Sequence, residues 1–138
     1  MSDEPKDDGP EITPETRDRL QAVRNGLLQL HKMMMDAEKN SYERANGPIA
    51  SPHAFLQLLM YDPWFGWLRP VSELVVQIDE LLDSRTPPGE AAGQATLREV
   101  RSLLNPVEEG EEFGVKYLKL MQTQPDVILK HGEIEKLL

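Results

Sequence analysis

The sequence contains no cysteine among its 138 residues. A chain without thiols cannot form disulfides, thiolate metal sites or cysteine nucleophiles, so these three kinds of chemistry are excluded. The absence of cysteine also fits a reducing compartment, and we expect a cytoplasmic protein.

Positive charge is scarce. The chain carries 15 lysines and arginines against 24 aspartates and glutamates, which gives a net charge of −9. Such a balance argues against nucleic-acid partners and anionic membrane surfaces, because both need a basic face. No apolar run approaches the roughly 18 residues needed to cross a bilayer. The acidic start of the chain also lacks the apolar stretch of a signal peptide.

Strand-like alternation of apolar and polar residues is also missing, whereas apolar spacings of three and four recur along the chain. Potential N-cap residues stand directly before proline, a pairing that favours helix starts. These dipeptides are Thr13-Pro14, Ser51-Pro52, Asp62-Pro63, Thr86-Pro87 and Asn105-Pro106, with Gln124-Pro125 as a weaker sixth. The predicted helices cover residues 14–46, 52–61, 63–83, 90–104, 108–124 and 125–138. We therefore predict an all-α fold: a helical bundle of four longer helices and two short ones.

Residues 1–12 are acidic and rich in proline, so we predict a disordered tail there and a single domain over residues 13–138. The helix at 63–83 carries both tryptophans and is predicted to be the spine of the bundle, kinked by Pro70. In the helix at 14–46 the predicted core stripe is Leu20, Val23, Leu27, Leu30, Met34 and Ala37, with Ser41 as a weaker seventh member. The short helix at 52–61 is predicted to bury Phe55, Leu56, Leu59 and Met60.

Gly26, inside the first helix, indicates either a bend or a close contact, and Gly66 is a candidate for the facing position.

Candidate ligand-binding residues flank the core stripes. His31, Glu38 and Tyr42 lie along one flank of the first helix, and Asp79 lies on the flank of the spine helix. If the two helices pack side by side, the histidine and the two carboxylates could converge on a divalent cation or act as an acid–base group. The alternative is that these side chains are simply hydrogen-bonded or solvated. His53 and His131 are expected to be exposed.

Candidate interaction residues are Trp64, Phe65, Trp67 and Arg69. A turn so rich in aromatic residues is usually core, but it could also be an exposed anchor for a partner. Arg69 could stack on an aromatic ring or pair with Glu73.

No catalytic residue, cofactor site or metal motif is predicted, since the chain has no glycine-rich phosphate loop, nucleophile elbow or His-Glu-x-x-His helix.

Six short runs carry a resemblance: Ser51-Pro52, residues 55–59, Asp62-Pro63-Trp64-Phe65, residues 67–70, residues 30–32 and residues 42–44. In these runs the chain resembles short all-helical bacterial proteins of unknown function. The resemblance implies a helical fold in a bacterial cytoplasm and supplies no catalytic residues.

Two functions remain open. The first is a non-enzymatic interaction or structural protein, with itself or another protein as partner. A homodimer would use the 64–68 turn and residues 134–138. The second is a small-molecule or metal-binding bundle, conceivably an enzyme, that uses His31, Glu38, Tyr42 and Asp79.

Overall fold

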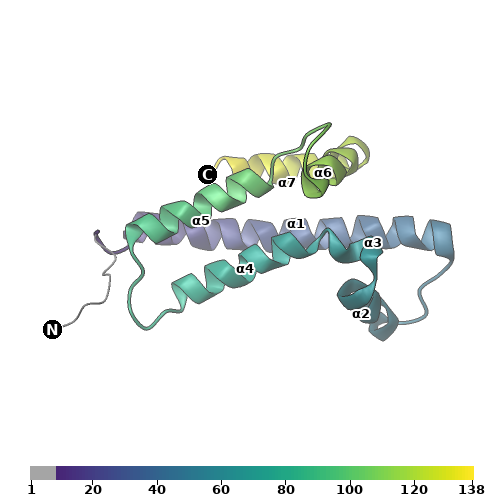
Figure 1. Ribbon diagram of the computed structural model, residues 1–138, viewed down its shortest axis with the longest axis horizontal. Helices are drawn as coiled ribbons and strands as arrows, with labels where there is room; N and C mark the ends of the chain where they lie inside the picture. The colour runs from purple at the N-terminus through teal and green to yellow at the C-terminus, as the bar shows by residue number, and fades with distance from the viewer. Residues whose placement is uncertain (1–8) are drawn as a thin grey trace.

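The computed structural model describes residues 9–138 (Figure 1). This part of the chain contains seven α-helices and no sheet. The helices are α1 (Pro14–Asn46), α2 (Pro52–Tyr61), α3 (Pro63–Gly66), α4 (Arg69–Leu82), α5 (Glu90–Leu103), α6 (Glu112–Thr123) and α7 (Pro125–Glu135). The predicted all-α bundle is confirmed. None of the helices in residues 9–138 combines the length and the apolar character that a membrane crossing requires.

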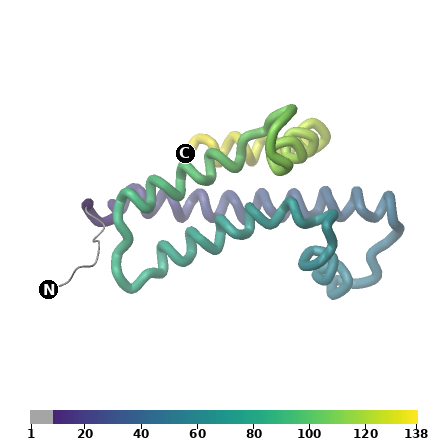
Figure 2. Tube along the Cα trace, in the orientation of Figure 1, coloured from purple at the N-terminus to yellow at the C-terminus, as the bar shows by residue number. Residues whose placement is uncertain are grey.

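The central element of the bundle is α1. It is 33 residues long and extends along the molecule in Figures 1 and 2. It contacts α3, α4, α5 and α7. The segment 63–83, predicted to be the spine, instead packs along one side of α1. The prediction of the central helix was therefore wrong, although the prediction of a bundle was right.

Local sequence sets both ends of α1. The hydroxyl of Thr13 accepts a hydrogen bond from the backbone N–H of Thr16 at 3.1 Å, and Pro14 occupies the first turn. At the other end Gly47 adopts a φ of 89°, a conformation that favours glycine, and its N–H donates to the carbonyl of Glu43 at 2.8 Å. The predicted boundaries of this helix are confirmed.

The segment predicted as one kinked helix is broken at Trp67 and Leu68. The N–H of Leu68 donates to the carbonyl of Phe65, and the N–H of Val71 donates to the carbonyl of Leu68, so the chain turns tightly between α3 and α4. Pro70 lies in the first turn of α4, where a backbone N–H has no helical partner to lose. This proline therefore starts a helix and does not kink one.

Two of the six proline dipeptides do not start helices. Beyond Thr86-Pro87, the carbonyl of Pro88 accepts from the N–H of Ile12 at 2.8 Å, and α5 begins only at Glu90. Beyond Asn105-Pro106, the N–H of Val107 donates to the carbonyl of Gly114 at 3.2 Å, and α6 begins at Glu112. A backbone contact with another segment, far away in sequence for Pro88 and only seven residues away for Val107, replaces the expected helical turn.

The predicted tail, residues 1–12, is only partly described, because residues 1–8 lie outside the described range. Its last residues are ordered. Ile12 and Pro10 form backbone hydrogen bonds with Pro88 and Glu90, and Glu11 forms an isolated antiparallel bridge with Gly89. The prediction of disorder was therefore wrong for residues 10–12.

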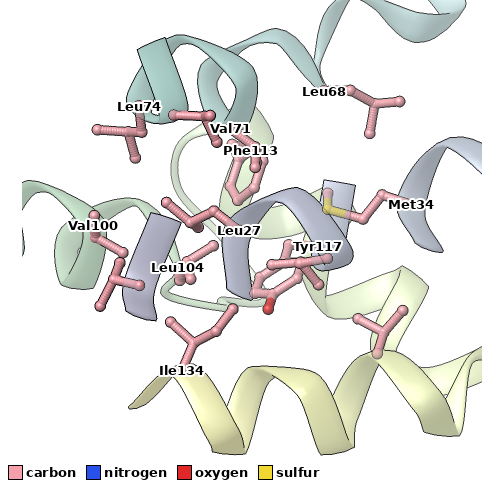
Figure 3. Packing of buried hydrophobic residues seen from close by; sticks show 14 of the residues in the cluster. Leu27, Met34, Leu68, Val71, Leu74, Val100, Leu104, Phe113, Tyr117 and Ile134 are labelled. Carbon is pink, nitrogen blue, oxygen red and sulfur yellow. The ribbon is translucent and has the colours of Figure 1, made fainter. Parts of the chain in front are cut away.

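The core is a single cluster of buried side chains from every helix except α2. Figure 3 shows Leu27 of α1 among Val71 of α4 and Phe113 and Tyr117 of α6. The six apolar residues of the predicted α1 stripe are buried, whereas Ser41 is only partly buried. Gly26 meets α7 and not Gly66: a Cβ at Gly26 would lie 2.8 Å from Cγ1 of Ile134. The glycine therefore permits the close approach of α7.

Candidate functional site

A polar contact with an indole joins α3 to the second half of α1. Nε1 of Trp64 donates a hydrogen bond to Oε2 of Glu38 at 2.7 Å. The ring of Tyr42, one turn further along α1, meets the ring of Trp64 edge-on, with centroids 5.4 Å apart. Burial raises the pKa of Glu38, and the hydrogen bond from Trp64 opposes that effect. Two predicted ligand residues and one predicted interaction residue thus form one cluster.

This cluster borders a cleft of about 730 Å³, which we name the indole cleft. It lies between α1, the α3 turn and α6, and two indoles, those of Trp64 and Trp67, are part of its wall. The full lining is Ala37, Glu38, Ser41, Arg44, Trp64, Trp67, Lys116, Lys119, Leu120, Thr123 and Gln124. Apolar and polar groups are both present, as is usual for sites that bind small molecules.

The charged groups of the indole cleft are mainly positive, whereas the chain as a whole is negative. Arg44, Lys116 and Lys119 line it together with one carboxylate, Glu38, whereas the chain has a net charge of −9. Lys116 lies 4.0 Å from Glu112, and both side chains are largely exposed. Among the salt bridges of residues 9–138, none involves Arg44 or Lys119. The arrangement can bind an anion.

His31 lies in a different hollow. It lines a space of about 510 Å³ between α1, α2 and the start of α4, together with Met35, Leu59, Met60, Phe65, Leu68, Arg69 and Ser72. Burial among these mostly apolar groups lowers the pKa of His31. Glu38 and Asp79 do not line this hollow.

Asp79 is bound to an arginine of α1. Nε of Arg24 donates to its Oδ1 at 2.8 Å, and Nη2 donates to its Oδ2 at 3.3 Å. This two-point contact fixes α4 against α1. The structure therefore does not bring His31, Glu38 and Asp79 together. Within residues 9–138, no three histidine or carboxylate side chains are grouped so that they could hold a metal ion.

The predicted interaction turn lies mostly in the core. Phe65 is 1% exposed and Trp67 is 4% exposed. The ring of Trp67 packs on Phe113, with centroids 5.5 Å apart. Arg69 is exposed and donates from Nη2 to the carbonyl of Met60 at 3.2 Å, so neither of its two predicted partners is found. Of the four predicted residues, Phe65 and Trp67 are too buried to act as surface anchors.

The C-terminal segment predicted as a second contact surface also packs against the bundle. Ile134 is 1% exposed. The guanidinium of Arg19 donates to the carbonyls of Leu137 and Leu138, both at 3.0 Å. These contacts hold residues 134–138 against α1.

The prominent apolar surface is instead on α2, which has no buried residue at all. Leu56 is 50% exposed, Met60 is 49% exposed and Tyr61 is 72% exposed; we call these three the α2 patch. The predicted burial of Leu56 and Met60 was therefore wrong. Figure 2 shows the reason: α2 lies apart from α5, α6 and α7, on the other side of α1. Only one side of this helix can find apolar neighbours, although its sequence is apolar nearly all round.

An open hollow of about 680 Å³ lies beside the α2 patch. It is lined by the end of α1, the following loop and α2, and Tyr61 belongs to both the hollow and the patch. Asp62 is the single charged residue of its lining, and the side chain of Asp62 already accepts from the N–H of Trp64 at 2.8 Å. The hollow and the patch together carry little charge, and the guanidinium of Arg69 lies at the edge of the patch, 3.2 Å from the carbonyl of Met60.

His131, expected to be exposed, is buried. The hydroxyl of Tyr117 lies 2.8 Å from its Nδ1, and its Nε2 lies 3.7 Å from Oε1 of Glu135. This Tyr–His–Glu chain has the elements of a proton relay, but Tyr117 is fully buried, and no substrate could reach it. Burial raises the pKa of Tyr117, so its hydroxyl stays protonated. The contact is structural and joins α6 to α7.

Comparisons of this chain with protein-family models, with curated proteins and with solved structures find no match.

Proposed function

We propose that this protein is a non-enzymatic association protein that forms a homodimer through the α2 patch and the hollow beside it. One observation carries the proposal: an apolar helix of this domain has no buried residue. Contiguous exposed apolar groups of this kind mark contact surfaces, whereas isolated ones are ordinary.

The charge pattern favours a second copy as the partner. In a two-fold dimer each patch meets the same patch, so any charge at its centre would face its own kind. A chain with a net charge of −9 therefore needs a nearly uncharged surface for self-association. The segment PHAFLQLLMY, which forms α2, contains no aspartate, glutamate, lysine or arginine.

Shape supports the same assignment. Leu56 and Met60 are four residues apart and form a ridge along the outer side of α2. The hollow beside α2 offers a concave, mainly apolar surface to side chains of that size. In a two-fold dimer the ridge of each copy can pack into the hollow of the other copy.

The expected affinity is modest. Burying the exposed half of one such side chain contributes about 1 kcal/mol, so three per copy contribute about 6 kcal/mol in a dimer. Association costs roughly 4–15 kcal/mol, and contacts in the hollow must supply the difference. A micromolar dissociation constant needs a net gain of about 8 kcal/mol, so contacts in the hollow would have to contribute at least about 6 kcal/mol. We therefore expect a reversible dimer with a dissociation constant between about 1 and a few hundred micromolar.

Sedimentation equilibrium between about 1 and 300 µM tests the proposal, because this range brackets the expected constant. The variant Leu56→Glu places a carboxylate in each patch of the dimer and should weaken association by about tenfold or more. Leu129→Glu is the matched control, because Leu129 is 72% exposed on α7, far from α2 in Figure 1. A chain that stays monomeric across the range, or two variants that dissociate equally, would overturn the proposal.

A further inference from the structure

The indole cleft has the features of a binding site in its own right, separate from the α2 patch. We propose that it binds a small organic anion that joins a flat ring to one acidic group, a carboxylate or a phosphate. The ring lies against the wall formed by Trp64 and Leu120, and the acidic group lies between Arg44 and Lys119.

The first argument is the local excess of positive charge. Three of the fifteen basic residues of the chain line this one cleft, against a single carboxylate. They come from two helices far apart in sequence, Arg44 from α1 and Lys116 and Lys119 from α6. The charge of Lys116 acts on Glu38, and Lys116 lies 4.0 Å from Glu112. Arg44 and Lys119 are therefore the basic groups of the cleft that an anion would engage. In an acidic chain this cleft is an evident place for a negatively charged ligand.

The second argument is the indole wall. Trp67 is 4% exposed and supports the wall from within the core, whereas Trp64 is partly exposed, and its hydrogen bond to Glu38 fixes its orientation. A fixed aromatic face accepts a flat ring with little loss of side-chain entropy. The neighbouring basic groups bind a carboxylate or a phosphate by charge-assisted hydrogen bonds. Ring and acidic group together are recognised better than either alone.

The third argument sets the charge and size of the ligand. Glu38 remains in the cleft, with Oε2 bound to Trp64, and its carboxylate opposes ligands that carry many negative charges. One acidic group is compatible with it. The volume of about 730 Å³ suits a molecule of drug or metabolite size. A polyanion or a nucleic-acid strand fits the cleft poorly.

The test uses the two tryptophans as reporters, since the chain contains no others and both line this cleft. The indole N–H signals of the ¹⁵N-labelled full chain are followed during titration with 1-naphthoate, 1-naphthyl phosphate, inorganic phosphate and 1-naphthalenemethanol. We expect saturable shifts with one or both naphthyl acids. The neutral alcohol and inorganic phosphate should each bind at least about fivefold more weakly. The better of the two acids identifies the acidic group.

Variants locate the binding. Lys119→Gln and Arg44→Gln should each weaken binding of the naphthyl acid by about fivefold to tenfold. Lys136→Gln and Arg98→Gln each remove one positive charge from an exposed position outside the cleft. They should change the affinity for the naphthyl acid by less than about twofold. Equal binding of acid and alcohol, equal effects of all four variants, or no saturable shift at millimolar ligand would overturn the proposal. Repeating the titration with Leu56→Glu, the variant that should weaken the proposed dimer, shows whether binding in the indole cleft depends on dimerisation.

Discussion

The hydroxyl of Tyr117 lies 2.8 Å from Nδ1 of His131 in the buried contact between α6 and α7. Each of these two buried polar groups is the hydrogen-bond partner of the other. The other ring nitrogen, Nε2, lies 3.7 Å from Oε1 of Glu135. One contact thus satisfies a buried hydroxyl and a buried ring nitrogen and joins α6 to α7.

Removal of that hydroxyl should destabilise the fold. Tyr117→Phe leaves Nδ1 of His131 buried without its hydrogen-bond partner, at a cost of about 1–3 kcal/mol in the free energy of unfolding. Urea denaturation followed by circular dichroism measures it. Tyr61→Phe is the control: Tyr61 is 72% exposed, and its change should stay within about 0.5 kcal/mol. Equal stability of the two variants would show that the Tyr117–His131 bond contributes nothing.

The close approach of α7 to α1 gives a second prediction. In Gly26→Ala the new Cβ would lie 2.8 Å from Cγ1 of Ile134, which is 1% exposed and has little room to move. We expect a loss of about 1–3 kcal/mol, despite the better helix propensity of alanine. Gly66→Ala is the matched control, because no atom lies within 4 Å of the Cβ it would add; it should be neutral or slightly stabilising.

A double-variant cycle identifies the cause. If the contact with Ile134 is responsible, Gly26→Ala should cost less in the background of Ile134→Ala, which removes Cγ1. An unchanged cost in that background would assign the effect to another contact of Gly26.

Much of the fold could be predicted from the sequence because its signals are local. The spacing of Leu20, Val23 and Leu27 continues along α1 and identified its buried apolar residues, although it missed the buried Thr16. Caps such as Thr13-Pro14 act within one turn. The break at Trp67 could not be predicted, since Pro70 is compatible both with a kinked helix and with the first turn of a new one. The burial of the surrounding aromatic residues, a tertiary effect, decides between them.

The candidate site was harder to predict because it, too, depends on tertiary packing. Spacing placed Glu38 and Tyr42 on one flank of α1, but it could not say whether Asp79 or Trp64 would face them. Lys116 and Lys119 gave no signal, because a lysine pair three residues apart is ordinary on an exposed helix. The exposed face of α2 had a signal that could have been used: a ten-residue helix with apolar groups on nearly every side cannot cover them all with one neighbour.

A third prediction concerns acid. Hydrogen bonds, first from the Thr16 hydroxyl and then from the backbone of Thr13, lower the pKa of Glu90 from 4.5 to about 2. A lowered folded-state pKa means that this group stabilises the fold above pH 4.5, and that the contribution disappears as the pH falls towards 2. Thermal melts should therefore show a lower Tm for Glu90→Gln at pH 7, with the gap to the wild type closing between pH 4.5 and 2. A gap that stays constant with pH would contradict the assignment.

A fourth prediction concerns Glu38, whose pKa is shifted in the opposite direction. Burial raises the pKa of this carboxyl group, so its ionised form opposes folding at neutral pH, and the opposition fades as the pH falls through the raised pKa. Glu38→Gln removes the charge but keeps an oxygen that can accept from Nε1 of Trp64, at 2.7 Å in the wild type. We expect its Tm at pH 7 to equal or exceed that of the wild type, and the difference to vanish near pH 4.

Trp64→Phe is the complementary change, since it removes the donor and leaves Glu38 half-buried without a partner. It should lower the free energy of unfolding at pH 7 by about 1–3 kcal/mol, and by less in the Glu38→Gln background, because a neutral amide is easier to leave unpaired than a carboxylate. Urea denaturation of the two single variants and the double variant gives the coupling directly. Strictly additive effects would mean that the hydrogen bond between α1 and α3 does not stabilise the wall of the indole cleft.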